Sequence, residues 1–151
     1  MSVVPVAQVS VFLDNRPGSL SEVMAHLDRL GVGIFALSIA DAGEFGLVRM
    51  IVGDPVRASG VLEDAGFNLA KSRKNTEVTA VLITEGDGIS RVTRILGDVG
   101  LNIEYAYSSA VHVDGKFALV LRASDVVRAE GALRGGGVGI LSLEDMREHF
   151  G

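Results

Sequence analysis

The chain of 151 residues carries two copies of one pattern. Residues 19–34, "SLSEVMAHLDRLGVGI", align with residues 88–103, "GISRVTRILGDVGLNI", at an offset of 69, and most of their apolar positions coincide. Residues 54–67 align with 125–138 at an offset of 71, so the second copy has two extra residues, most simply in the turn 112–115. A duplication of this kind predicts two similar folding units, and it limits the fold more than any other feature of the sequence.

Within each copy, apolar residues alternate as in a strand and then recur as on one face of a helix. The first copy predicts strands near 7–14, 33–41, 45–52 and 67–73, and helices near 19–30 and 55–65. The second copy predicts strands near 78–84, 102–112, 116–122 and 138–143, and helices near 88–99 and 125–134. The order βαββαβ, found twice, predicts an α+β protein of two ferredoxin-like units with antiparallel sheets, in domains 1–73 and 77–151.

Local signals mark several helix ends. Ser19 and Glu22 have the spacing of a capping box, in which the serine hydroxyl accepts from the Glu22 N–H and the glutamate carboxylate reaches back. Asp54, with a proline after it, has the form of an N-cap. Gly31 and Gly66 each follow a run of helical spacing, where a left-handed residue is expected to end the helix.

Composition narrows the classes of function. The chain is 48% hydrophobic and has no cysteine, so it can bury a core without disulfides and offers no thiolate ligand. A net charge of −5 disfavours a nucleic-acid partner, and the basic cluster Lys71, Arg73 and Lys74 is expected to be a solvated connector. No apolar run approaches the roughly 20 residues of a membrane span, and no secretory leader is evident, so we expect a cytoplasmic protein without a membrane partner.

Two binding functions known for this topology lack their residues here. A metal chaperone needs a ligand cluster in the first loop, but the two loops read "DNRPGS" and "TEGDGI". The three histidines are scattered without ligand spacing, so we expect no metal site and no cofactor. An RNA-recognition domain needs stacking aromatics on its third strand, where residues 45–50 read "FGLVRM", with Leu47 and Met50 in place of two of them.

Catalysis is also disfavoured. An enzyme acting on small substrates needs a nucleophile or an acid and base pair in a cleft. Asp14, Glu85 and Asp87 lie near the loops, but carboxylates at helix starts are more often caps and partners of the helix dipole. The sequence shows no catalytic constellation, and we expect no enzymatic activity.

The loop "NRPGSL", followed by an amphipathic helix and then by "GVGIFAL" and "FGLVRMIV", resembles an ACT domain. Domains of that family typically carry Asn/Asp-x-Pro-Gly-x-Leu after the first strand and Gly-hydrophobic-Asn-Ile at the start of the second. The second motif stands in the second copy at Gly100–Ile103, and the first motif stands in the first copy as Asn15, Arg16, Pro17, Gly18, Ser19 and Leu20. The resemblance covers nearly the whole chain, and it implies sheets joined side by side with a small ligand, usually an amino acid, at their junction.

The first loop suits the carboxylate of such a ligand. Gly18 permits a close backbone approach, Pro17 stiffens it, and the N–H groups at the start of the helix favour an anion. The alternative is a plain, well-capped corner between a strand and a helix. The second loop lacks the proline and carries Glu85 and Asp87, which would repel a carboxylate, so we expect one good site in the first loop and a degenerate partner.

Three further residues complete the expected site. Tyr105 and Tyr107 share a face of the second strand of the second copy, and they either pack a ligand side chain or fill the interface between the copies. Arg49 interrupts an apolar strand, where it meets a ligand carboxylate or forms an ion pair. The apolar residues around it lie on both faces of that strand, which predicts a homodimer.

The sequence therefore predicts a non-enzymatic sensor that binds an L-amino acid at the junction of two repeats. The alternative is a regulatory or scaffolding module with empty sites that binds an enzyme subunit.

Overall fold

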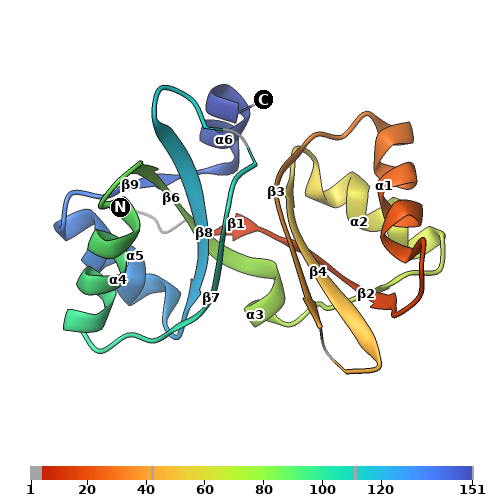
Figure 1. Ribbon diagram of the computed structural model, residues 1–151, viewed down its shortest axis with the longest axis horizontal. Helices are drawn as coiled ribbons and strands as arrows, with labels where there is room; N and C mark the ends of the chain where they lie inside the picture. The colour runs from red at the N-terminus through yellow and green to blue at the C-terminus, as the bar shows by residue number, and fades with distance from the viewer. Residues whose placement is uncertain (1–4, 42, 111, 151) are drawn as a thin grey trace.

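The computed structural model describes residues 5–41, 43–110 and 112–150. Figure 1 shows two lobes whose sheets face the centre of the molecule and whose helices lie mostly on the outside. The first part of the chain forms β1 (Val6–Ala7), β2 (Val9–Asp14), α1 (Ser19–Leu30), β3 (Ile34–Asp41), β4 (Phe45–Val52), α2 (Pro55–Asp64) and β5 (Asn68–Leu69). The second part forms α3 (Arg73–Thr76), β6 (Glu77–Thr84), α4 (Gly88–Asp98), β7 (Ile103–Ser108), β8 (Lys116–Ala123), α5 (Val126–Gly135), β9 (Gly139–Leu141) and α6 (Leu143–Phe150).

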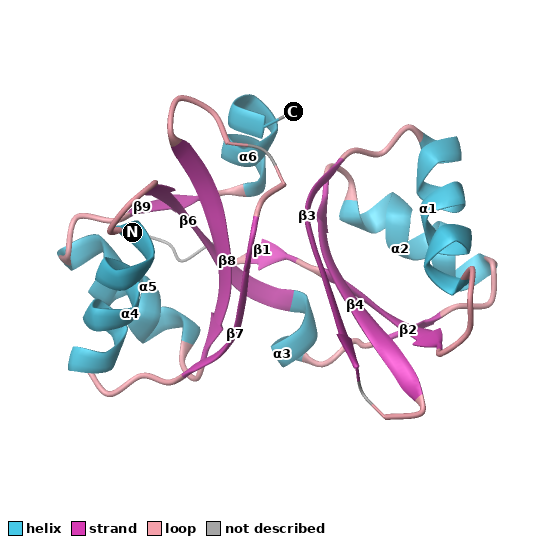
Figure 2. Ribbon diagram, in the orientation of Figure 1, coloured by secondary structure: helices cyan, strands magenta, loops and turns pink. Residues whose placement is uncertain are grey.

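Both repeats have the expected βαββαβ architecture. The first sheet has the order β3-β4-β2-β5, and the second has the order β1-β6-β8-β7 with β9 also paired to β6. Every ladder is antiparallel. Figure 2 shows α1 and α2 on the outer face of the first sheet, and α4 and α5 on the outer face of the second. The predicted fold class, two ferredoxin-like units in an α+β protein, is confirmed.

Helix signals in the sequence act mostly as predicted. The Asp54 carboxylate accepts a hydrogen bond of 3.1 Å from the Arg57 N–H, so the predicted cap of α2 is confirmed. Gly31 ends α1 in the left-handed conformation, with φ at 67°, and Gly66 follows α2 with φ at 91°. The capping box predicted at Ser19 is wrong, because the Ser19 hydroxyl donates to the Asp14 carbonyl at the end of β2.

Three apolar clusters hold the lobes and join them. Two lie between a sheet and its own helices. The third lies between the two sheets, where Ile51 and Phe35 of the first repeat pack with Val120 and Met146 of the second. The edge strands β3 and β7 also lie side by side at one end, through the bridge between Ala36 and Ser109, and below it the sheets diverge (Figure 1). The expected side-by-side junction is therefore a short contact of edges extended by a contact of faces.

Four details differ from the sequence expectations. The strand expected over 67–73 is the two-residue β5, and the polar residues after it form α3, because they offer no apolar face to a sheet. The strand expected over 102–112 ends at Ser108. Strand β1, at the start of the chain, pairs with β6 of the second repeat, Val6 opposite Val78. Helix α6 was not expected, and its Met146 is fully buried in the core between the sheets.

The apolar strand β4 is covered on both faces within one chain. Val48 and Met50 face the helices of the first repeat, and Ile51 faces the second repeat. The face that we expected to meet another sheet therefore meets the other repeat of the same molecule. A homodimer remains a prediction, with a weaker basis than the sequence suggested.

None of the helices in the described parts of the chain is long and apolar enough to cross a membrane.

Candidate functional site

A buried polar cluster lies where the two repeats meet, and we call it the Gln8 cluster. Gln8 is 3% exposed and stands between β1 and β2. Its amide nitrogen lies 3.1 Å from Ser10 Oγ, 2.9 Å from the Asn75 carbonyl oxygen and 2.9 Å from Tyr105 Oη. Its carbonyl oxygen accepts a hydrogen bond of 2.6 Å from the Tyr107 hydroxyl. One side chain of the first repeat thus fixes both tyrosines of the second.

Both tyrosines stay protonated donors in this setting. Burial, and then the neighbouring Tyr105, raise the pKa of Tyr107 well above its usual range. Burial also raises the pKa of Tyr105, whose hydroxyl donates a hydrogen bond of 2.6 Å to the Lys74 carbonyl. Because their hydroxyls bond to protein groups and their rings pack against the core between the sheets, the tyrosines occupy the interface themselves. This geometry supports interface filling, one of the two roles left open by the sequence, and contact with a ligand stays a prediction.

Arg49 lies against this cluster without an acidic partner. Its guanidinium carbon is 3.8 Å from the centroid of the Tyr105 ring, a cation–π contact. Its Nε is buried and has no hydrogen-bond partner, and no carboxylate of the described residues pairs with it. The ion pair expected as one alternative is therefore not formed within the described chain. The Tyr105 ring therefore provides the contact that holds the guanidinium.

The first loop turns into α1 through Gly18, whose φ of 88° favours glycine. Ser19 is only 5% exposed, and its hydroxyl donates to the Asp14 carbonyl at 2.6 Å, back toward β2. It therefore does not accept from the Glu22 N–H, which bonds instead to the Gly18 carbonyl at 3.0 Å. The predicted capping box is wrong because the serine lies at the start of the helix, one residue inside the cap.

The Glu22 carboxylate pairs with Arg16 instead of reaching back to the backbone. Arg16 Nη2 lies 3.1 Å from both carboxylate oxygens. Asn15 and Pro17 are exposed, and Leu20 packs against the core of its own repeat. Beside the loop lies a pocket of about 260 Å³, which we call the first corner pocket. It is lined by Phe12, Asp14, Arg16, Ser19, Glu22, Ala65, Gly66, Phe67 and Asn68.

The structure does not bring the first loop and the tyrosines together. The loop follows the C-terminal end of β2, whereas Gln8 and its tyrosine partners lie at the N-terminal end of that strand. Six residues of strand separate these ends by about 16–20 Å. Arg49 lies with the tyrosines and not with the loop. The nine residues expected to form one site therefore fall into two groups within a chain.

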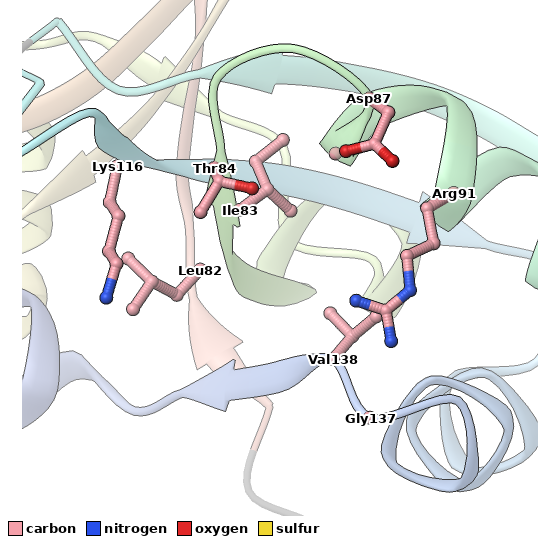
Figure 3. A pocket seen from close by; sticks show the side chains of 9 residues that line it. Leu82, Ile83, Thr84, Asp87, Arg91, Lys116, Gly137 and Val138 are labelled. Carbon is pink, nitrogen blue, oxygen red and sulfur yellow. The ribbon is translucent and has the colours of Figure 1, made fainter.

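A matching pocket lies at the equivalent corner of the second repeat, and we call it the second corner pocket. It measures about 210 Å³ and is lined by Leu82, Ile83, Thr84, Asp87, Gly88, Arg91, Lys116, Gly137 and Val138. Figure 3 shows Arg91 reaching toward Val138 while Lys116 lies beside Leu82. Gly88 permits the close approach of α4 to β6, because a Cβ there would lie 2.9 Å from Ile83 Cβ. The pocket thus lies between the ends of two strands and two helices.

These arrangements suit binding by charge and hydrogen bonds. Among the described residues, no group of three His, Asp or Glu side chains is placed to hold a metal ion. Glu85 pairs with His112 at 2.5 Å, and that imidazole stacks on Phe117. The charged groups at these sites are the Arg49 guanidinium at the junction and the arginine, lysine and carboxylate side chains that line the two corner pockets.

The family of the chain is shown by its sequence. Residues 4–135 match the family model described as an ACT domain pair. The chain therefore belongs to the ACT-domain family, a family of regulatory modules. A comparison with curated proteins gave no match.

Solved structures share the fold over nearly the whole chain. Protein BT0572 from Bacteroides thetaiotaomicron is 29% identical, with a TM-score of 0.84 over 94% of this chain and 95% of that one. The ligand-free regulatory subunit of aspartate kinase from Thermus thermophilus is 15% identical, with a TM-score of 0.63 over 88% and 91%. The corresponding subunit from Thermus flavus is 14% identical, with a TM-score of 0.57 over 91% and 97%. The two Thermus structures show a shared fold alone.

Sequence reasoning missed the residues that organise both regions. Gln8 precedes the first repeated segment, so the alignment of the copies gave no reason to single it out. Arg91 and Lys116 are ordinary surface cations in the sequence. The alignment did hold one signal, because Arg91 stands at the place of Glu22, with the opposite charge, at the offset of 69.

Proposed function

We propose that this ACT domain pair is a non-enzymatic, cytoplasmic regulatory module that binds an L-amino acid. The observation that carries the proposal is the family match over residues 4–135, together with a small pocket at the strand-to-helix corner of each repeat. The backbone of the first corner leaves room for a ligand, since Gly18 has open space where a side chain would otherwise stand. An α-amino acid carries the charges that these corners are able to recognise without a reactive side chain.

Two groups of residues are proposed as ligand contacts, by family resemblance. One is the first loop, from Asn15 to Leu20. The other is the junction group of Arg49, Tyr105 and Tyr107, in which Arg49 supplies the unpaired charge. The limits of the two domains, 1–73 and 77–151, are proposed on the same basis.

The test is thermal unfolding of the full chain with each common L-amino acid at millimolar concentration. A ligand that binds the folded state alone raises the midpoint, because its binding free energy adds to the stability of that state. We expect a selective rise of at least about 2 °C for one chemical class of amino acid. If no amino acid raised the thermal midpoint, the proposed sensor function would be wrong and the second candidate would be favoured.

That second candidate is a module with empty sites that binds an enzyme subunit. It is favoured by two valines at equivalent positions, at an offset of 71. Val56 on α2 is 82% exposed and Val127 on α5 is 63% exposed. Exposed apolar side chains at the same place on both outer helices suit a protein partner.

We also propose that the chain is a homodimer, in which a second copy brings a junction group near a first loop. The two groups are separated within one chain, and a partner offers a way to unite them. Multi-angle light scattering from 1 to 100 micromolar is expected to give twice the mass of the 15.9 kDa chain. A constant single mass over this range would contradict the dimer.

A further inference from the structure

The two corner pockets are equivalent by the repeat but opposite in charge. Arg91 stands where the first copy has Glu22, at the offset of 69, and Lys116 stands where it has Phe45, at the offset of 71. The charged residues of the first corner pocket, Asp14, Arg16 and Glu22, sum to a formal charge of −1. Those of the second, Asp87, Arg91 and Lys116, sum to +1. The second corner is therefore the one that attracts an anion.

The charges of the second corner pocket are also less engaged. In the first corner Arg16 is paired with Glu22 and lies 3.7 Å from Asp14, so its charges offset one another. In the second, neither the Lys116 nor the Asp87 side chain forms an ion pair or hydrogen bond with any described residue. Their charges remain available to a ligand.

Arg91 is held in place at one wall of the pocket. Its Nη2 donates to the Gly136 carbonyl, in the turn that leads from α5 to β9. That hydrogen bond uses one of the five N–H donors of the guanidinium and fixes its position. A cation fixed in this way loses little conformational entropy when it binds a carboxylate.

The two carboxylates of the second loop are placed differently with respect to the pocket. The Glu85 carboxylate contacts the His112 imidazole. Glu85 is also absent from the lining of the pocket, which Asp87 does line. Within the lining of the pocket, one carboxylate is opposed by two cations.

We propose that the second corner pocket binds an acidic amino acid, with Arg91 and Lys116 on its two carboxylates and Asp87 on its ammonium group. The inference rests on the proposed function and names the ligand class. The two cations and one carboxylate of the pocket match, in number and sign, the two carboxylates and one ammonium group of such a molecule. A pocket of about 210 Å³ is smaller than the roughly 300–1,000 Å³ of sites for drug-sized ligands, which suits a small metabolite.

The test is calorimetric titration of the full chain with L-aspartate and L-glutamate. L-asparagine lacks the second carboxylate and succinate lacks the ammonium group, so both are expected to bind more weakly. Lys116→Gln and Arg91→Gln each remove a charge-assisted hydrogen bond, and each is expected to weaken binding by about tenfold or more. Arg94→Gln makes the same charge change at an exposed position of α4 outside the pocket, and it is expected to leave the affinity unchanged.

Asp87→Asn separates the role of the carboxylate from that of the cations. It is expected to weaken binding of L-aspartate and to leave succinate unchanged or tighter, because only the ammonium contact is lost. Equal weakening of both ligands would overturn the role given to Asp87.

The remaining outcomes distinguish this inference from the proposed function. Selective binding of a neutral amino acid would overturn the ligand class and leave the sensor standing. A second outcome is that L-aspartate binds Lys116→Gln and Arg91→Gln as tightly as the wild type but fails to bind Gly18→Asp. That result would place the ligand in the first corner pocket and overturn the assignment to the second. A chain that binds none of the common amino acids would overturn both.

Discussion

Replacing Gln8 by alanine is expected to lower the free energy of unfolding by about 2–4 kcal/mol. The substitution removes the acceptor of the Tyr107 hydroxyl and a neighbour of Ser10, Asn75 and Tyr105 at once. A partly buried polar group left without a partner costs about 1–3 kcal/mol, and the lost packing of the side chain adds to this. At about 2–4 °C per kcal/mol for a chain of this size, the thermal midpoint is expected to fall by about 4–16 °C.

A neighbouring residue provides the matched control. Within the described residues, the Asn75 side chain donates to the exposed Ser72 hydroxyl alone, while its backbone carbonyl accepts hydrogen bonds from the Gln8 cluster. Asn75→Ala therefore keeps the cluster, and its midpoint is expected to stay within about 2 °C of the wild type. Circular dichroism during heating measures both variants. If Gln8→Ala melted together with Asn75→Ala, the cluster would contribute nothing to holding the repeats together.

The Gln8 cluster also shows where sequence reasoning reached its limit. Periodicity locates α1 and β4 at their observed bounds, because their apolar faces are set by residues close in the chain. Strand β1 pairs with β6, about 70 residues away, and nothing in the short run Val6–Ala7 indicates that partner. Helix α6 lies outside the repeat, so the comparison of the copies had no second example of it. An alignment of the two copies compares equivalent positions, and it does not indicate which surface of one repeat contacts the other.

The candidate sites were predictable to a similar extent. The motif at residues 15–20 correctly locates a turn that needs a left-handed glycine at Gly18. The motif does not determine side-chain packing. It therefore gave no indication that the Ser19 hydroxyl bonds to the end of β2, or that Arg16 pairs with Glu22. The two carboxylates of the second loop read as equivalent in sequence. Their difference arises because His112, from beyond β7, reaches one of them.

Glu130 presents the opposite case from Gln8, since its removal is expected to stabilise the fold. It lies in α5 with no exposed surface, and neither of its carboxylate oxygens has a hydrogen-bond partner. Burial raises the pKa of Glu130, an effect that the Arg134 guanidinium partly opposes. At neutral pH the fold therefore bears a cost at Glu130, because a buried carboxyl without a hydrogen-bond partner either stays ionised or takes up a proton. Glu130→Met, which replaces it by an apolar chain of similar length, is expected to raise the free energy of unfolding by about 1–3 kcal/mol at pH 7.5.

The pH dependence identifies the cause. Because the pKa of Glu130 is raised in the folded state, the folded chain binds this proton more tightly than the unfolded chain. The stability gained from this tighter proton binding is fully present below the pKa of Glu130 in the unfolded chain. It is lost as the pH rises through the higher pKa of Glu130 in the folded chain. The advantage of Glu130→Met over the wild type is therefore expected to grow from pH 4.5 to pH 7.5.

Two companion variants decide whether charge or shape produces the gain. Glu130→Gln removes the ion but keeps a buried polar group, so its stability at pH 7.5 is expected to fall between those of the wild type and Glu130→Met. Glu148→Met makes the same change at an exposed position of α6, and it is expected to alter stability by less than about 0.5 kcal/mol at either pH. A gain in Glu130→Met that were the same at both pH values would show that added apolar packing, and not the removed charge, is responsible. A gain that follows the titration would instead mean that the fold keeps a destabilising carboxylate in the second repeat, at a position where the first repeat has Ser59.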